Sequence, residues 1–531
     1  MKLINSVVIL LIFMDAMLTS SNAFLMGVPS TILAVSTTDN MKTKSLTAAS
    51  RISLSLPRAR GVGNKGIKAS STAASSGNSD DSKSNEQTIS LASFNLIKGC
   101  VGSGVLSLPA GVAAIGDVSK AVVPASSIIF ILGLISAYTF HLLGRLTAVV
   151  SSESDNGQES KSPMVTSIGQ LWDHEIGTST SWLISLVVML TCYGTCLSYS
   201  IILGDTFKSL AETAGLSGIL TTRRFNVAAI ALLGVYPLSC LKSLAALAPV
   251  SITGVLGILM TCIVMTFRAL PGGAYSSTAA AATATATTNY LQSLPAEFRP
   301  SFGVTGLRSP RSLLVLSSMT ATAFLVHMSS PEFYQTLQKP TLARFGTLSA
   351  IGFGSTALIS AYMMIVGFLT FGGASKGMIL NNYSTLDAGA TFCRLLMGVS
   401  LLGSYAFLSH ATKKAFYQIF YKGQEEITDK MHYRTTRLLV GTLTALALLI
   451  NDAGFVVSVT GAVFGSALIY MVPSYLFLKS TTRRVENGSL QLTKMLQIER
   501  WCNRGLICLG VFLGLAGAWM SVVNSFFPHL L

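Results

Sequence analysis

The chain has 531 residues, of which 50% are hydrophobic and only 11% are charged, and its mean hydropathy is +0.58. This composition excludes an ordinary water-soluble protein and indicates one that crosses a membrane many times. The formal charge of +15 does not require a nucleic-acid partner, because Lys and Arg lie mainly in the N-terminal segment and in the loops between apolar stretches.

The N-terminal residues read as a leader. Residues 1–23 combine an early Lys2, an apolar run and a small-residue ending, as in a cleavable signal peptide. Residues 24–88 are rich in Ser, Thr and basic residues and cannot form a core. Together the two segments resemble the bipartite plastid leader of algae. A disordered tail on an endomembrane protein would have the same composition. We expect a plastid envelope or an endomembrane, with the vacuolar and plasma membranes as alternatives.

The transmembrane domain is predicted over residues 89–531. Eleven apolar stretches are long enough to cross about 30 Å of hydrocarbon as helices. They lie at about 92–115, 121–149, 181–207, 225–241, 245–268, 312–329, 346–371, 391–411, 435–451, 454–478 and 503–526. Their length excludes a β-barrel, so we expect an all-α multi-pass protein in the lipid bilayer. The excess of Lys and Arg in the loops on the N-terminal side predicts that the N-terminus faces the cytosol.

The first stretch contains a sequence unsuited to a continuous helix. Residues 94–109 are apolar but are interrupted by Gly99, Gly102, Gly104 and Pro109. An unpaired backbone amide costs several kcal/mol in hydrocarbon, so such interruptions are tolerated where the backbone faces a protein-lined cavity or a solute. The segment therefore predicts a binding site, although small residues also serve close helix packing.

The sixth stretch shows a second interruption, because Ser318 to His327 places hydroxyl residues and a histidine in the middle of the membrane, followed by Pro331. The two interrupted segments lie five spans apart. Interrupted helices in corresponding positions of two halves are typical of transporters built from inverted repeats, which bind solute near the midplane. His327 alone fits a hydrogen bond between helices equally well.

Several motifs resemble those of the amino acid/auxin permease family, and the first of them is closest to the proton-coupled branch. The similarity covers about residues 88–526 and is carried by Asn95 to Pro109, Tyr193-Gly194 to Gly204-Asp205, Pro237-Leu238-Ser239, Ala323-Phe324 with His327, residues 367–372 and residues 380–383. The resemblance implies an eleven-span transporter with the five-plus-five inverted repeat of the bacterial leucine transporter, broken helices 1 and 6, and alternating access.

An amino acid suits these two interruptions as the solute. The backbone amides at the start of the second half-helix would present donors and a positive dipole end to an α-carboxylate; they belong to Gly102, Ser103, Gly104 and Val105. Carbonyls in the sixth stretch, near Thr320 and Thr322, could accept from the ammonium. Phe324 and Tyr193 are candidate pocket walls, although aromatic residues in a bundle more often only pack. No counter-charge for a charged side chain is evident, so we expect a neutral amino acid.

Lys98 is the most informative candidate for ion coupling. A cation in the bilayer core is expensive and usually marks an ion or substrate pathway. In the sodium-coupled branch this position resembles an asparagine that helps to bind sodium, together with a hydroxyl that matches Ser404, whereas Lys98 and Gly99 resemble the proton-coupled branch. Asn95 and His327 complete the predicted ion-coupling set. We therefore expect proton-coupled or uncoupled transport, with sodium coupling as the alternative; snorkelling of Lys98 is a further interpretation.

Other function classes fit the sequence less well. Gly204-Asp205 suggests an intramembrane aspartyl protease, but Ile202 replaces the expected first glycine and Asp452 lies in a loop. No catalytic triad, phosphate loop or metal-ligand set is visible, so we expect neither an enzyme, a metal nor an organic cofactor. A sensor that binds amino acids without transport remains an alternative. The sequence predicts no oligomeric state.

Overall fold

The computed structural model describes residues 87–155, 165–241, 248–270, 275, 299–303, 306–307, 310–421 and 427–527. The predicted signal peptide and the segment that follows it, up to residue 86, lie outside the described residues, so both remain predictions. In the described part of the chain nearly all regular structure is helical, and only isolated bridges of single residue pairs occur besides the helices. The all-α fold class is confirmed.

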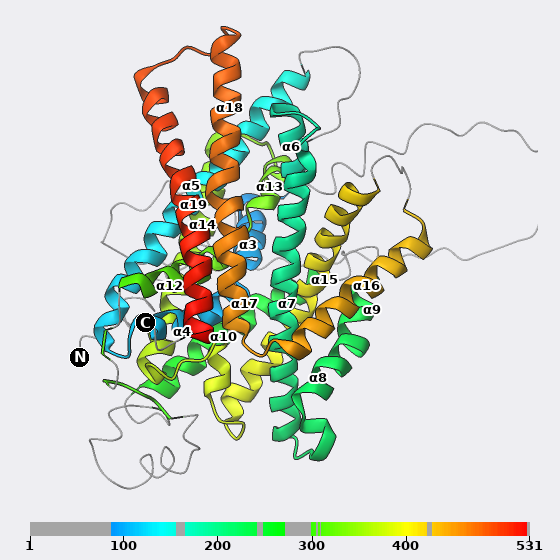
Figure 1. Cartoon of the computed structure of the whole chain (residues 1–531), viewed down its shortest axis with the longest axis vertical. Coiled ribbons are helices and arrows are strands. Elements are labelled where there is room, and N and C mark those ends of the chain that lie inside the picture. Colours follow the sequence, from blue (N-terminus) through cyan, green and yellow to red (C-terminus); the bar gives the residue numbers. More distant parts are fainter. Residues whose placement is uncertain are drawn as a thin grey trace, which may run out of the picture. The chain divides into compact units, whose positions relative to one another are not determined.

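Figure 1 shows most of the helices running roughly along one direction as a bundle. Their bounds are α3 Ile89–Cys100, α4 Ser103–Ile115, α5 Val122–Asp155, α6 Ile168–Glu175, α7 Ser181–Thr213, α8 Arg223–Ile230, α9 Tyr236–Ser239, α10 Ala248–Ala269, α12 Leu313–Ala323, α13 Ser330–Thr336, α14 Leu342–Phe371, α15 Ala388–Phe420, α16 Asp429–Leu449, α17 Ala453–Thr460, α18 Val472–Glu486 and α19 Lys494–Phe526. Short 3₁₀ and π-helical segments connect several of them.

The helices follow the predicted spans in order. Among the described residues, seven helical stretches are long and apolar enough to cross a membrane, and the bent pair α3 and α4 makes an eighth. The predicted spans at 225–241, 245–268 and 435–451 are occupied by the helices α8 with α9, α10 and α16. These three do not meet the same test of length and hydropathy. A multi-pass membrane protein is confirmed, whereas the count of eleven stays a prediction.

The first span is broken where the glycine-rich segment predicts it. The helix α3 ends at Cys100, Val101 and Gly102 leave the helical conformation, and α4 begins at Ser103 with a bend of 49°. Of the four residues predicted to interrupt the span, only Gly102 lies at the break. Gly99 lies inside α3, and Gly104 and Pro109 lie inside α4. Neighbouring helices allow a proline inside a membrane helix, and here the close approach of α14 at Gly367 covers the ring.

The sixth span is broken as well. The helix α12 ends at Ala323, residues 324–326 are irregular, and a 3₁₀ turn from His327 to Ser329 leads into α13. The two broken spans are therefore the first and the sixth, as predicted. By contrast, α15 continues without a break from Ala388 to Phe420, which agrees with the absence of prolines from its second half.

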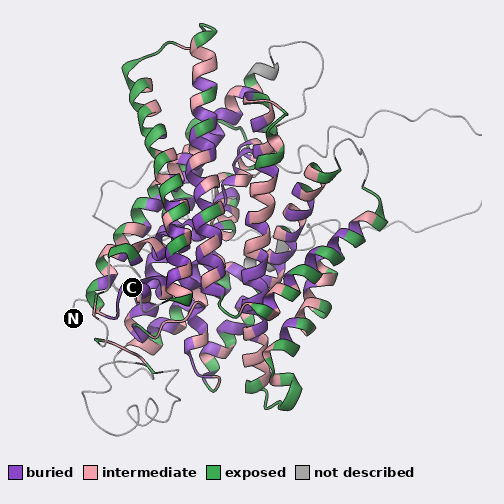
Figure 2. Ribbon diagram, in the orientation of Figure 1, coloured by how far each residue is buried: buried purple, intermediate pink, exposed green. Residues whose placement is uncertain are grey.

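Packing places the two broken spans inside the bundle. The half-helix α4 packs against α12 and α14, and α12 also contacts α17 and α19. Figure 2 shows buried residues concentrated on the inner helices, whereas exposed residues follow the outer faces of α16 and α19. Exposed apolar side chains such as Leu515 and Trp519 on α19 are expected for helix faces in contact with lipid. The breaks consequently lie among protein atoms.

Candidate functional site

The breaks in the first and sixth spans touch each other through their backbones. A Cβ atom built on Gly104 would lie 2.8 Å from the backbone nitrogen and 2.9 Å from the Cα of Ala323. Only glycine allows this approach, because no side-chain atom fits between the two chains. The first turn of α4 therefore packs directly on the last turn of α12, which brings together two segments that lie more than 200 residues apart.

The sequence predicts a binding cavity between the two interruptions, and this remains a prediction. At Gly104 and Ala323 themselves the two backbones are in direct contact. A cavity of about 510 Å³ lies further along α4, and its lining includes Ala110 and Ala114 but none of the residues at the breaks. Binding of an amino acid between Gly104 and Ala323 would therefore require α4 and α12 to separate.

The start of α4 has polar neighbours on α7. The hydroxyl of Ser103 lies 3.2 Å from that of Ser198. The hydroxyl of Tyr199 fills the space beside Gly102 and accepts a hydrogen bond from the backbone of Ser103. A helix N-terminus leaves its first backbone N–H groups without partners inside the helix, so it attracts hydroxyls and anions. Ser103 and its neighbours Gly104 and Val105 thus begin α4 as the sequence predicts.

Tyr199 is the residue at this site that the sequence analysis missed. Tyr193, the tyrosine predicted from the sequence, is half-buried and lies near Tyr405 of α15. Helical spacing could have found Tyr199, because Cys192 and Cys196 precede it by seven and three residues and share its buried face. Which of the two tyrosines reaches the first span depends on the face that α7 turns toward it.

The predicted residues at the end of α12 have other partners. The hydroxyl of Thr320 donates to Leu316 O at 2.7 Å within its own helix, whereas that of Thr322 donates to Val457 O on α17 at 2.8 Å. The ring of Phe324 is fully buried against Phe353, with centroids 6.2 Å apart. Thr322 and Phe324 thus join the end of α12 to α17 and α14, whereas Thr320 bonds within its own helix. The carbonyl groups of α12 remain as acceptors for a bound ammonium.

Lys98 lies at the meeting point of three spans. Its Nζ donates to Ser400 Oγ at 3.0 Å and to Ser404 Oγ at 2.9 Å, both on α15. A Cβ atom on Gly254 of α10 would lie 2.6 Å from this nitrogen. No carboxylate among the described residues forms an ion pair with Lys98. The structure thus brings Lys98 and Ser404 together and adds Ser400, one helical turn earlier.

The other two residues of the predicted ion-coupling set have hydrogen-bond partners other than Lys98. Asn95 donates its side-chain amide to Gln87 Oε1 at 3.1 Å, near the start of α3. His327 is fully buried, and its Nε2 lies 3.0 Å from both Ser136 O and Thr139 Oγ1 of α5. The carbonyl of Ser136 can only accept, so Nε2 carries the proton. His327 therefore fixes the irregular part of the sixth span to α5.

Comparisons with known proteins agree with this architecture. The family model described as "Transmembrane amino acid transporter protein" matches residues 85–523. A relative from Danio rerio, named "Putative sodium-coupled neutral amino acid transporter 11", is 27% identical over 452 residues and covers 84% of this chain and 87% of its own. "Sodium-coupled neutral amino acid transporter 7" from Mus musculus is 24% identical over 460 residues, covering 83% and 88%.

Among solved structures, that of MhsT in complex with L-phenylalanine aligns with a TM-score of 0.47 and 13% identity, covering 80% of this chain and 98% of MhsT. The family match extends over most of the chain, from just before α3 to near the end of α19, and includes both broken spans. Its members are transporters, which also excludes an enzyme as the identity of this chain. The protein belongs to the family of transmembrane amino acid transporter proteins.

Proposed function

We propose that the protein moves neutral amino acids across its membrane by alternating access. The observation that carries this proposal is the contact of the two broken spans at Gly104 and Ala323, where helix termini meet inside the bundle. The names of the relatives, which specify neutral amino acids, support the substrate class. Uptake of a panel of amino acids by proteoliposomes tests it: neutral ones should accumulate, and accumulation of charged ones alone would contradict it.

The substrate's α-carboxylate would bind the N–H groups of Ser103, Gly104 and Val105, because these form the positive end of α4. The hydroxyl of Tyr199 already lies at this terminus and would donate to the same carboxylate. The ammonium would bind carbonyl oxygens at the end of α12, since Thr320 and Thr322 use their hydroxyls elsewhere. The aliphatic or aromatic side chain would occupy the space that opens when α4 and α12 separate.

For ion coupling we propose that the Lys98 ammonium takes the role of a bound cation, so that transport is proton-coupled or uncoupled. The geometry supports this proposal because Nζ uses the hydroxyls of Ser400 and Ser404, for which a sodium ion would have to compete. An amine that lacks a carboxylate partner can lose and regain its proton when its surroundings change. Loss of the proton would free both hydroxyls for the next conformation.

Sodium coupling is the second candidate, and the names of the relatives favour it. Uptake under separate proton and sodium gradients distinguishes the two. Lys98→Ala should lower uptake and abolish its response to a proton gradient, with Lys120→Ala, an exposed lysine, as the matched control. Lys98→Asn should introduce stimulation by sodium, because an amide oxygen is a ligand for a hard cation. Unchanged uptake and unchanged pH dependence in Lys98→Ala would refute the proposal.

A sensor of the same fold would bind amino acids without moving them. The same proteoliposomes separate this alternative from transport, because a sensor would show binding without accumulation inside the vesicles. The extension before α3 does not favour sensing, since its composition is that of a leader. Accumulation of a neutral amino acid would therefore exclude a sensor that carries no flux.

We also propose that residues 1–88 direct the protein to a plastid envelope or to an endomembrane. The proposal rests on the apolar run and on the basic, hydroxyl-rich segment that follows it. A fluorescent protein fused to the C-terminus would report the final membrane without blocking the leader. Fluorescence confined to the plasma membrane would contradict both locations.

A further inference from the structure

The cavity of about 510 Å³ lies at the end of the bundle remote from Gln87. Its apolar wall includes Ala113 of α4 and Met319 of α12, and its polar wall includes Asp205 of α7 and Asp452 before α17. Lys376 and Asn524 also line it. A volume of this size suits a small organic molecule, and a wall with charges beside an apolar wall suits a zwitterion with an uncharged side chain.

This cavity is separate from the contact of the two breaks. Ala110, which lines it, follows Gly104 by six residues, or about 9 Å along α4. Directly after Ala110, Gly111 allows α4 to pack closely on Leu316 and Met319 of α12. The two positions are therefore consecutive along the groove between α4 and α12, with the cavity on the outer side and the break further inside.

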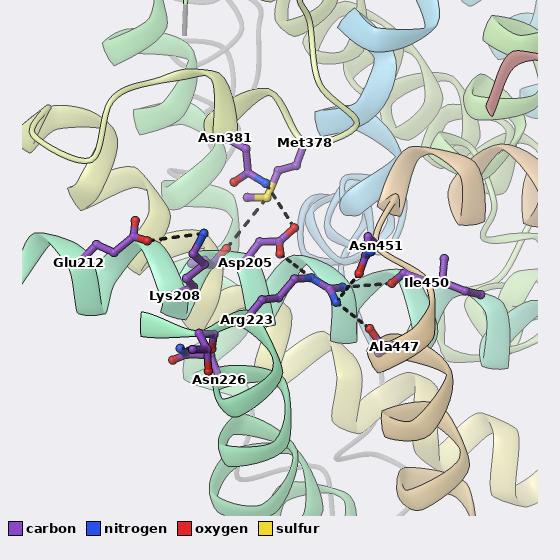
Figure 3. Close-up of polar contacts among 12 residues, drawn as sticks. Asp205, Lys208, Glu212, Arg223, Asn226, Met378, Asn381, Ala447, Ile450 and Asn451 are labelled. Atoms are coloured by element: carbon purple, nitrogen blue, oxygen red, sulfur yellow. Dashed lines mark hydrogen bonds and ion pairs between the residues drawn. The ribbon is translucent and has the colours of Figure 1, made fainter. Parts of the chain in front are cut away.

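One carboxylate of the cavity is held by ionic contacts. Figure 3 shows Asp205 joined to Arg223, whose Nε lies 2.9 Å from Asp205 Oδ1. The same guanidinium donates to Ala447 O at 3.0 Å and to Ile450 O at 3.1 Å, so it also closes the end of α16. Asn381 approaches Asp205 Oδ2 at 3.5 Å. These contacts fix the polar wall in position, and Arg223 compensates the charge of Asp205.

The other carboxylate has capacity for a ligand. Asp452 caps α17, because its Oδ1 accepts from the Gly454 N–H at 2.8 Å. In the described part of the chain, its second oxygen, Oδ2, has no hydrogen-bond partner, and the residue is exposed. A carboxylate that lines a cavity of mixed polarity and keeps one oxygen available as an acceptor is a suitable partner for an ammonium group.

We propose that this cavity is a second binding site for the transported amino acid, which occupies it before it reaches the broken spans. The substrate's ammonium binds Asp452, and its side chain lies against Ala113 and Met319. The inference rests on the proposed transport of neutral amino acids. It adds a site, a residue and an order of events: binding at Asp452 first, then separation of α4 from α12 and movement to Gly104.

Protection of an introduced thiol tests the site in the purified full-length protein. The variant Ala113→Cys places the thiol on the cavity wall, in a chain whose exposed Cys502 and Cys508 are changed to Ser. Ser217→Cys, exposed in the loop after α7, is the matched control. A transported neutral amino acid should slow maleimide labelling of Ala113→Cys several-fold and leave Ser217→Cys unchanged. Equal rates with and without the amino acid would overturn the proposal.

Two further variants assign the protection to the cavity. Gly104→Leu fills the contact with Ala323, so protection should persist in this variant even though transport is lost. Asp452→Asn retains the cap of α17 but removes the charge. It should raise the amino acid concentration that gives half-maximal protection about tenfold. Loss of protection in a monodisperse Gly104→Leu variant would overturn the proposal. Equal protection by sodium ions alone, or by an analogue of the amino acid that lacks the amino group, would also overturn it.

The same measurements distinguish the two proposals. If the unmodified chain transports neutral amino acids but Ala113→Cys is not protected, the second site is wrong and the transport function stands. If the unmodified chain neither transports nor binds any neutral amino acid, the proposed function itself is wrong. Size-exclusion chromatography and thermal unfolding of each variant confirm that labelling is compared between folded proteins.

Discussion

Two regions along the groove between α4 and α12 are built differently. At the breaks, backbone packs on backbone, and Gly104 is the residue that allows the approach to Ala323. At the outer cavity, side-chain charges and amides line the space, and an ion pair between Asp205 and Arg223 fixes the wall. The comparison indicates that the packing at the breaks depends on residue size and on main-chain geometry, whereas the position of the polar wall of the cavity depends on charge.

The largest effect should come from adding volume at the breaks. Gly104→Leu should lower uptake roughly 100-fold, because the side chain would displace the backbone at Ala323 from the geometry that binding requires. Gly354→Leu on α14 is the matched control, since a Cβ there meets no atom within 4 Å. Initial rates in proteoliposomes measure the effect, and equal rates for both variants would show that the breaks tolerate bulk.

Breaking the ion pair should affect stability. Arg223→Leu leaves Asp205 without its partner and frees the carbonyls at the end of α16, which should cost about 2 kcal/mol for a pair that remains partly exposed. Unfolding in detergent measures the loss. The double variant Arg223→Leu with Asp205→Leu should recover part of it. A double variant as unstable as the sum of the single variants would contradict a direct coupling.

The two tyrosines of α7 provide a paired test at the breaks. Tyr199→Phe removes the hydroxyl beside Gly102 and Ser103, and should raise the substrate concentration for half-maximal uptake about tenfold. Tyr193→Phe should leave it unchanged, because Tyr193 lies near Tyr405. A larger effect of Tyr193→Phe than of Tyr199→Phe would instead support Tyr193 as the wall of the binding pocket, as the sequence predicts.

The smallest effect should come from the hydroxyls of α12. Thr322→Val removes a hydrogen bond to Val457 O on another helix and should cost about 1 kcal/mol of the free energy of unfolding. Thr320→Val should cost less, because its hydroxyl bonds only within its own helix. Comparing the two unfolding midpoints checks this, and a greater loss in Thr320→Val would contradict the assignment.

Local features of the sequence predicted the parts of the fold that depend on nearby residues. Glycines in an apolar span predict the break at Gly102, and the family resemblance correctly pairs Lys98 with Ser404. Pro109 misleads, because the effect of a proline in a helix depends on whether neighbouring helices accommodate it. That information lies in α14, far away in the chain.

The polar wall of the cavity could not be predicted from the sequence. In the sequence, Asp205 appears only as part of a motif. No nearby residue in the chain identifies Arg223, eighteen residues later, as its partner. The contacts of Arg223 with the end of α16 join residues more than 200 positions apart. The closure of the breaks was also unpredicted, since it depends on which conformation of an alternating-access cycle the chain adopts.

The most direct test of the account is an experimental structure of the protein with a transported neutral amino acid. We predict substrate density between α4 and α12, with its carboxylate on the N–H groups of Ser103 to Val105 and its ammonium on the carbonyls near Ala323. Density elsewhere, with Gly104 and Ala323 still in contact while transport is active, would contradict the central claim.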